Sequence, residues 1–231
     1  MPNQLIDNEF GVIKIRRSRI ARNIRLRVDQ RGNLGISLPL RAPLFLAKQL
    51  LESSRADIRQ NLQTISKSRT VLRHGDLIGK THKLVIIKGD VQKSRIIGTT
   101  LEIALPENAA IESPEVQRYI RTAALKALRT QAKAYLTRRL HQLATTYGFS
   151  YKKLRFTNAG TRWGSCSSTG TISLNIWLMQ LPFELIDYVL VHELCHTKQM
   201  NHSSNFWALV ETIAPNYKIL RRSLKAQQPY A

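Results

Sequence analysis

The chain has 231 residues, 43% of them hydrophobic, which is enough for one large domain or two small ones with a real core. Its 36 Lys and Arg residues against 15 Asp and Glu residues give a formal net charge of +21, which predicts a strongly positive surface. No apolar run approaches the roughly 20 residues of a membrane span, and the N-terminus lacks a signal-peptide pattern, so we expect a cytoplasmic location.

The first part of the chain, residues 1–110, predicts a small, basic, β-rich α+β region. From Ile24 to Val28, apolar residues alternate with arginines, which is the period of a half-buried strand. A turn at 30–33 would join this strand to a returning strand, so that the arginines line one exposed face. An apolar stripe from Pro43 to about Ile65 predicts a helix. The strands expected in this region are 24–28, 34–38, 83–88, 94–97 and 101–105.

The second part, residues 111–231, predicts a domain that opens with a long helix. Ser113 is a suitable N-cap, Pro114 suits the first helical position, and Gly148 is a natural stop. Three strand-like segments follow, then a mostly buried helix and a shorter final one. The strands expected in this region are 153–158, 161–166 and 171–178.

The most informative segment runs from His192 to His196 and reads His-Glu-Leu-Cys-His, near the end of the predicted buried helix. In a helix, His192 and His196 lie one turn apart on the same face, where both imidazoles can bind one Zn²⁺. Glu193 lies beside the first ligand, where its carboxylate can reach a water on the metal. A buried helix has no packing need for two histidines and a glutamate. The pattern therefore predicts zinc-dependent hydrolysis with Glu193 as the general base.

The third metal ligand has two candidates. His202 lies ten residues after His192, which is the metzincin spacing, but Gln199 replaces the glycine of that pattern and no Met-turn follows. Asn201 in the left-handed conformation would end the helix and turn His202 back toward the metal. Glu211, a carboxylate from the next helix, is the alternative.

Several segments together resemble a known family. They are Thr161-Arg162-Trp163-Gly164-Ser165-Cys166, Ile172-Ser173-Leu174-Asn175, and Tyr188 to His196 followed by His202 and Phe206-Trp207. This combination is similar to the YgjP-like metallopeptidase domain family, prokaryotic zincins related to the SprT-like and Wss-like proteases. The match is dense over residues 150–225 and less distinctive in the basic strand region 16–39.

The resemblance implies a zincin-like core in residues 111–231, one Zn²⁺ held by His192, His196 and His202, and Glu193 as catalytic base. Together with the N-terminal region, this makes α+β the expected fold class.

A hydrolytic site also needs a group that stabilises the developing oxyanion, and zinc supplies much of this. Arg162, Asn175 and Tyr217 are the candidates for a second donor or a substrate contact. Arg162 and Asn175 also have structural alternatives, an ion pair and a capped turn. By analogy with zincins, an extended substrate is expected to pair with a strand edge at Trp163 to Ser165.

Two hypotheses of function follow. The first is a zinc-dependent endopeptidase that acts on a protein or peptide substrate. The second is a nucleic-acid-associated protein whose zinc site is structural or weakly catalytic, and a combination of the two is a DNA-stimulated protease of bound proteins. The basic clusters at 16–31 and 129–155 support polyanion contact. No helix-turn-helix, zinc-finger or RNP signature accompanies them, so sequence-specific readout is not expected.

Overall fold

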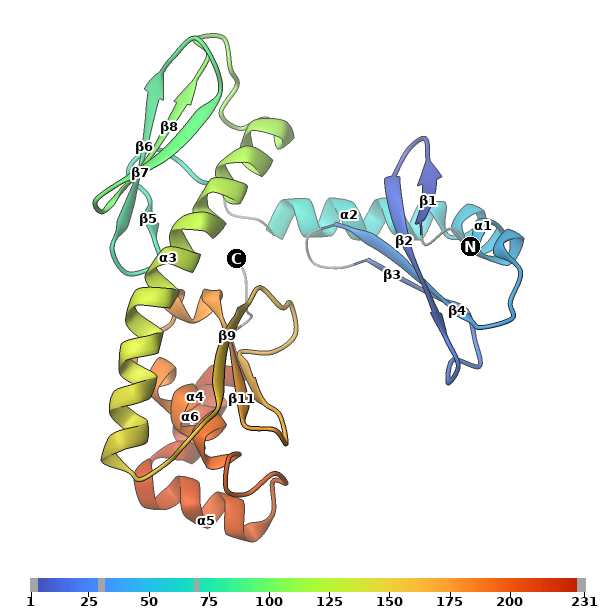
Figure 1. Cartoon of the computed structure of the whole chain (residues 1–231). Helices are drawn as coiled ribbons and strands as arrows, with labels where there is room; N and C mark the ends of the chain where they lie inside the picture. The colour runs from blue at the N-terminus through green and yellow to red at the C-terminus, as the bar shows by residue number, and fades with distance from the viewer. Residues whose placement is uncertain (1–3, 29–31, 69–70, 228–231) are drawn as a thin grey trace. The chain divides into compact units, whose positions relative to one another are not determined.

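The computed structural model describes residues 4–28, 32–68 and 71–227, which form two compact units divided between Thr70 and Val71 (Figure 1). The fold is α+β, as predicted, with 41% helix and 26% strand. The division falls earlier than the expected boundary at 110–111, because strands within 77–105 share a hydrophobic core with the long helix that follows them.

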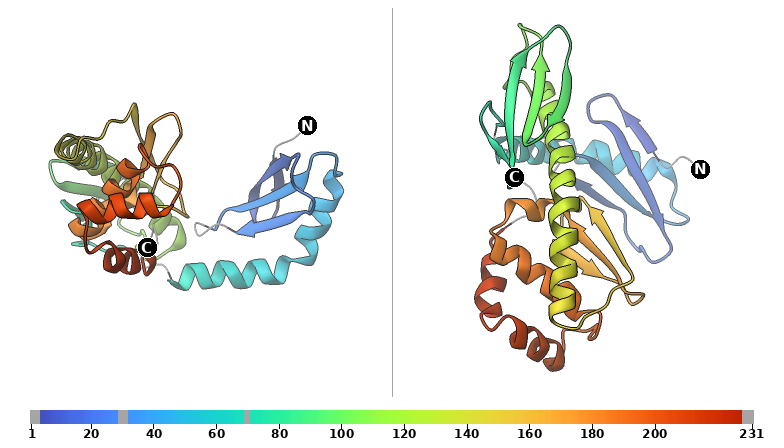
Figure 2. Two further views of the ribbon diagram at one scale, coloured as in Figure 1. Left: turned by 90° about the horizontal axis from the view of Figure 1, so that it is seen from below. Right: turned by 60° about the vertical axis from the view of Figure 1, so that its left-hand side comes forward.

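The first unit is a four-stranded sheet with two helices over one face (Figure 2). Its elements are β1 (Gln4–Asp7), β2 (Gly11–Ser18), β3 (Arg25–Val28), β4 (Leu34–Pro39), α1 (Leu44–Ser53) and α2 (Arg55–Ser68). The strand order is β1-β2-β4-β3, in which β2 and β4 are parallel and the other neighbours antiparallel. β3 and β4 form the predicted hairpin, although residues 30 and 31 of its turn lie outside the described residues.

The helix expected from Pro43 to Ile65 is interrupted at Ser54. The Ser54 N–H donates to the carbonyls of Leu50 and Leu51, at 3.1 and 3.2 Å, which ends α1. The interruption changes the direction of the chain, so that Leu51 on α1 and Ile58 on α2 are both buried in one core with the inner faces of β2 and β4.

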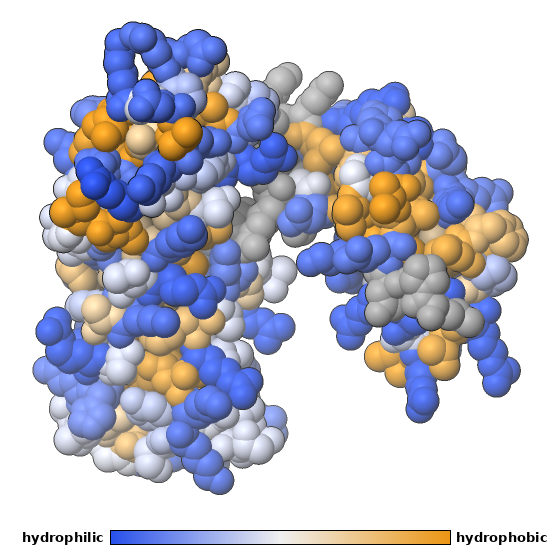
Figure 3. Space-filling model, turned by 45° about the horizontal axis from the view of Figure 1, so that its top comes forward, coloured by the Kyte–Doolittle hydropathy of each residue, from blue (hydrophilic) through white to orange (hydrophobic). Residues whose placement is uncertain are grey.

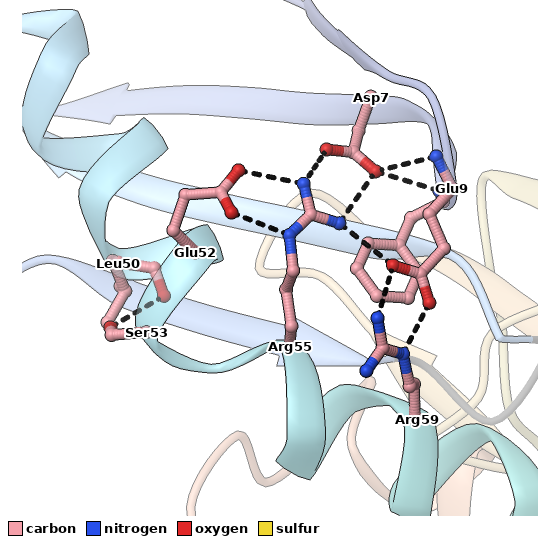
Figure 4. A network of polar contacts seen from close by, with 8 residues as sticks. Asp7, Glu9, Leu50, Glu52, Ser53, Arg55 and Arg59 are labelled. Atoms are coloured by element: carbon pink, nitrogen blue, oxygen red, sulfur yellow. Dashed lines mark hydrogen bonds and ion pairs between the residues drawn. The ribbon is translucent and has the colours of Figure 1, made fainter.

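Arg55 lies at the centre of an ion-pair network between α2 and the N-terminal strands (Figure 4). Its guanidinium donates to Asp7 at 2.7 Å, to Glu9 at 2.9 Å and to Glu52 at 2.7 Å, while Arg59 donates to Glu9 at 2.6 Å. Hydrogen bonds from these guanidinium groups hold the pKa values of Asp7, Glu9 and Glu52 below their ordinary values.

The second unit is organised along α3 (Figure 1). Its elements are β5 (Leu77–Ile78), β6 (His82–Lys88), β7 (Lys93–Ile97), β8 (Thr100–Leu105), α3 (Pro114–Thr146), β9 (Lys153–Thr157), β10 (Gly164–Cys166), β11 (Thr171–Asn175), the 3₁₀-helix η1 (Ile176–Gln180), α4 (Phe183–Cys195), α5 (Ser204–Ile213) and α6 (Tyr217–Lys225). One sheet has the order β5-β6-β8-β7 and the other β10-β11-β9, and strands of both contact α3.

The ends of α3 follow the sequence prediction, whereas the last predicted strand does not. The Ser113 hydroxyl accepts from the Val116 N–H at 3.3 Å, and Gly148 has a φ of +64° just beyond the helix. The strand expected to reach Leu178 ends at Asn175, because the Asn175 side chain accepts from the Trp177 N–H at 3.2 Å and caps η1.

Helix α4 is buried on most of its surface, and a bidentate salt bridge connects it to α3. Arg139 on α3 donates to both carboxylate oxygens of Asp187 on α4, at 2.8 and 2.7 Å. Apolar residues from Leu185 to Leu194 fill the core around α4. The C-terminal turn of α4, which carries the predicted metal ligands, is therefore held within a packed core.

The visible surface of each unit is largely hydrophilic, with smaller hydrophobic patches between the polar residues (Figure 3). Among the described helices, none combines the length and the apolar character needed to cross a bilayer.

Candidate metal centre

Three histidine side chains converge at the C-terminal end of α4. Nε2 of His192 lies 3.2 Å from Nε2 of His196 and 3.1 Å from Nε2 of His202. Metal–nitrogen bonds of 2.0–2.1 Å at a tetrahedral angle place two ligand nitrogens about 3.3–3.4 Å apart. Both separations from His192 are close to that value, and the three ligand nitrogens all lie within 4.8 Å of one another, so together they could hold one divalent metal ion.

Protonation and orientation of the imidazoles suit metal binding. Burial, followed by the charges of the neighbouring histidines, lowers the pKa of His192 to about 3, and burial also lowers the pKa of His196. Both rings are therefore neutral at pH 7. Nδ1 of His196 lies 3.1 Å from the Gln199 carbonyl, which can only accept, so Nδ1 carries the hydrogen and Nε2 keeps its lone pair.

The turn after α4 differs from the sequence prediction. No described residue other than glycine has a positive φ, so Asn201 is not in the left-handed conformation. Instead the Lys198 and Gln199 N–H groups both donate to the Cys195 carbonyl, at 3.1 and 2.9 Å, and the Ser203 N–H donates to the Asn201 carbonyl at 2.8 Å. This tight series of backbone bonds reverses the chain without the strained residue.

Two adjacent aromatic residues of α5 support the ligand rings. The Phe206 ring is fully buried and stacks on His196 at 4.5 Å between centroids, and the Trp207 ring stacks on His202 at 5.5 Å. Tyr217 stacks on Trp207 at 5.3 Å with an interplanar angle of 17°. His202 is exposed, and the stack on Trp207 supports one face of its ring.

Glu193 is buried beside the histidines without a partner for one of its oxygens. Its exposed fraction is 5%, and Oε2 has no hydrogen bond among the described residues. Burial raises the pKa of the carboxyl to about 8, against the opposing effect of the Arg162 charge. The unpartnered oxygen leaves one position of the carboxyl open to exchange a proton with a neighbouring group.

Gly164 makes the position of Glu193 possible. A Cβ atom at residue 164 would lie 2.6 Å from Oε1 of Glu193, 2.8 Å from Cγ and 2.9 Å from Cδ. These distances are shorter than real Cβ contacts, so only glycine lets β10 pass this close to the carboxylate. Gly164 lies within the segment 161–166 that resembles the family, but no local pattern in the sequence predicts this role.

The three candidates for oxyanion or substrate contact lie in different environments. Asn175 is fully buried, and both amide hydrogens are used in bonds to the carbonyls of Ala159 at 2.6 Å and Arg162 at 2.9 Å. Asn175 therefore holds the loop before β10 and has no hydrogen to offer a substrate. Tyr217 belongs to the aromatic stack, whereas Arg162 is exposed and close enough to influence the pKa of Glu193.

Glu211, the alternative third ligand, lies outside the histidine group found among the described residues. Its carboxylate is half-exposed and lies 3.9 Å from the Lys218 ammonium group. The geometry thus brings His202, and not Glu211, together with the histidines of α4.

Comparison with known proteins shows the family of the chain. A sequence model of the YgjP-like metallopeptidase domain family matches residues 22–227. The chain belongs to this family. A search of curated proteins found no match. The crystal structure of the metallopeptidase zymogen of Pyrococcus abyssi abylysin is similar to part of the chain, with 27% identity over 39% of this chain and 91% of that chain, and a TM-score of 0.36.

Membership of this family, together with a histidine group suited to a metal ion, identifies the chain as a metallopeptidase. Sequence reasoning found the histidines and Glu193 because their spacing is local. It missed the supports from Gly164, Trp207 and the Gln199 carbonyl, which depend on contacts between separate elements.

Proposed function

We propose that this YgjP-like protein is a zinc-dependent endopeptidase in which His192, His196 and His202 hold the metal and Glu193 is the general base. The observation that carries the proposal is the pairing of three converging Nε2 atoms with a buried, partner-free oxygen of Glu193. A structural metal site has no use for that carboxylate.

The donor set favours zinc. Three neutral imidazoles leave the fourth tetrahedral position open, which is the arrangement of catalytic rather than structural zinc sites. When bound, the ion supplies Lewis acidity, lowering the pKa of water and polarising a carbonyl oxygen.

The residues of the chain perform the remaining steps. Oε2 of Glu193 takes the proton of the attacking water and returns it to the leaving amine nitrogen. Arg162 is the only cation among the three donor candidates, its charge lowers the pKa of Glu193, and it takes part in none of the ion pairs of the described residues. We therefore assign it to oxyanion or substrate contact.

Strand β10 offers an edge for an extended substrate. It is the end strand of its sheet, and the carbonyl of Trp163 and the N–H of Ser167 bond to β11, at 2.9 and 3.0 Å. In an antiparallel pair, the backbone groups of the alternate residues Gly164 and Cys166 therefore point away from β11. An open strand edge accepts the middle of a peptide chain, which supports endopeptidase action.

A pair of variants on α4 tests the proposal. Glu193→Gln is expected to keep its zinc and to lose peptide cleavage by at least a hundredfold, because the amide cannot take the proton. Glu184→Gln, an exposed residue in the first turn of the same helix, is the matched control and should cleave as the wild type does. Cleavage by Glu193→Gln at the wild-type rate would refute the assignment of the base.

A second candidate function is association with nucleic acid, favoured by the open face of the first unit. The outward positions on the central strand β4 are small, Gly35 and Ser37, and each is flanked by a cation on both neighbouring strands. These exposed cations are Lys14, Arg16, Arg25 and Arg27. Four cations gathered on one exposed face make a positive surface that a phosphate backbone would neutralise.

The salt dependence of DNA binding tests this candidate. Four phosphate contacts predict that log K falls with log salt concentration at a slope of about −3.6. The double variant Arg25→Gln/Arg27→Gln should reduce the slope by about 2. Lys48→Gln/Lys126→Gln removes the same charge elsewhere and should leave the slope unchanged. Peptide cleavage that rises on addition of DNA would unite the two functions, and equal slopes for both double variants would exclude the proposed face.

A further inference from the structure

A hollow of about 450 Å³ lies on the sheet formed by β9, β10 and β11. Register places Ser165 opposite Ser173, and Ser173 opposite Arg155, so one row of polar side chains crosses the three strands on the same face. Thr171 extends this face along β11, and Arg162 borders it at the start of β10. The hollow is therefore built from one sheet face, from Arg162 before β10, and from the end of β10 with the turn that follows it, which supply Cys166, Ser167 and Thr169.

The lining supplies hydrogen-bond donors and positive charge without a counter-charge. It contains two guanidinium groups, from Arg155 and Arg162, together with hydroxyl groups and one thiol, and it contains no carboxylate. Neither arginine takes part in the ion pairs of the described residues. Guanidinium and hydroxyl groups that face one hollow make a site for a carboxylate or a phosphate.

Strand β10 lies between the hollow and the carboxylate of Glu193, and its residues face both. Side chains alternate between the two faces of a strand, so Gly164 faces Glu193 while Ser165, the next residue, faces the hollow. A substrate strand paired with the open edge of β10 would likewise alternate its side chains between the metal side and the hollow side. Of the two side chains that flank the scissile bond, the one on the hollow side would then point toward Arg162 and Arg155.

We propose that this hollow is the subsite that receives an acidic side chain of the peptide substrate, with Arg155 and Arg162 pairing its carboxylate. The proposal rests on the endopeptidase function and names the substrate class, peptides with Asp or Glu beside the cleaved bond. Arg155 determines specificity without taking part in the reaction, since it lies on β9, two strands away from the edge strand β10.

Peptide cleavage tests the subsite in the full-length zinc-loaded protein. Cleavage sites in a proteome-derived peptide library are mapped by mass spectrometry, and matched peptides with Glu, Gln or Lys at each flanking position are then compared by kcat/KM. The wild type is expected to prefer Glu over Gln by about tenfold, the effect of one charge-assisted contact at a partly open site. Arg155→Gln should remove this preference, while Lys153→Gln, an exposed cation on the same strand outside the lining, should keep it.

A binding measurement keeps the subsite testable if no peptide is cleaved. Two fluorescein-labelled pools of randomised octapeptides, with Glu or Gln fixed at one central position, are titrated with the zinc-loaded Glu193→Gln variant by anisotropy. The subsite is supported if Glu193→Gln binds the Glu pool more tightly than the Gln pool and the double variant Glu193→Gln/Arg155→Gln does not. This result would support the subsite even if the wild type cleaves no peptide and the endopeptidase function is refuted.

Two results overturn the subsite while leaving the endopeptidase function intact. One is equal cleavage of the Glu and Gln peptides by the wild type. The other is a Glu preference that persists in Arg155→Gln. Inorganic phosphate is expected to displace the Glu pool more than chloride does at equal ionic strength, because the same guanidinium groups bind either anion. Phosphate binding at Arg155 without any Glu preference would instead assign the hollow to a free anion and overturn the proposal.

Discussion

Replacing Gly164 by alanine tests the position of the Glu193 carboxylate, because the variant would move this group without changing its chemical identity. The new Cβ would start 2.6 Å from Oε1, and an ordinary contact of about 3.4 Å requires the carboxylate to move by about 0.8 Å. A misplacement near 1 Å at a catalytic group costs about a hundredfold in rate. We therefore expect kcat to fall about a hundredfold, with zinc retained because the three atoms nearest to the added Cβ all belong to Glu193 and none to a histidine.

The stability of this variant decides how the rate is interpreted. Overpacking a core costs about 1–3 kcal/mol, so the protein should remain folded with a modestly lower Tm. The assay combines peptide cleavage, zinc per chain by elemental mass spectrometry, and thermal unfolding. Gly35→Ala is the control, because its Cβ would meet only the Lys14 carbonyl at 3.8 Å. Wild-type kcat in a folded, zinc-loaded Gly164→Ala protein would refute the placement of Glu193.

Three further predictions follow from the contacts around the site and in the first unit. Trp207→Leu removes the ring that supports His202 and should weaken zinc binding about tenfold in a chelator competition, and an unchanged affinity would exclude the stack as a support. Glu211→Gln should leave zinc affinity unchanged, because its carboxylate faces Lys218, and a loss would make Glu211 a ligand. Asp7, Glu9 and Glu52 have lowered pKa values in the folded state, so their contribution to stability is present above about pH 4 and is lost as pH falls through the lowered values. Arg55→Gln should reduce that acid dependence, measured by far-UV circular dichroism, and an unaltered pH profile would contradict it.

The parts of the fold that the sequence predicts are those with local signals. Ser113 and Gly148 carry the chemistry of a helix start and stop, and both ends of α3 agree with that prediction. The spacing of His192 and His196 is equally local, so it could be interpreted without knowing what packs around it.

The parts that escaped prediction depend on contacts between distant segments. The expected division near residue 110 ignores that Leu84 and Leu101 are buried with α3, which periodicity within each strand cannot reveal. Gly164 looks like any other glycine until Glu193, 29 positions later in the chain, is found in the space that a Cβ at residue 164 would occupy. The hollow at Arg155 appears only when the register of β9, β10 and β11 is known.

The most direct test of the metal centre is the zinc content of wild-type protein beside His202→Ala, with His141→Ala, an exposed histidine of α3, as control. After purification without chelators and with zinc re-added, we expect one zinc per chain in the wild type and in His141→Ala, and a sharp loss in His202→Ala. Full zinc retention in His202→Ala, or no zinc in the wild type, would contradict the three-histidine site.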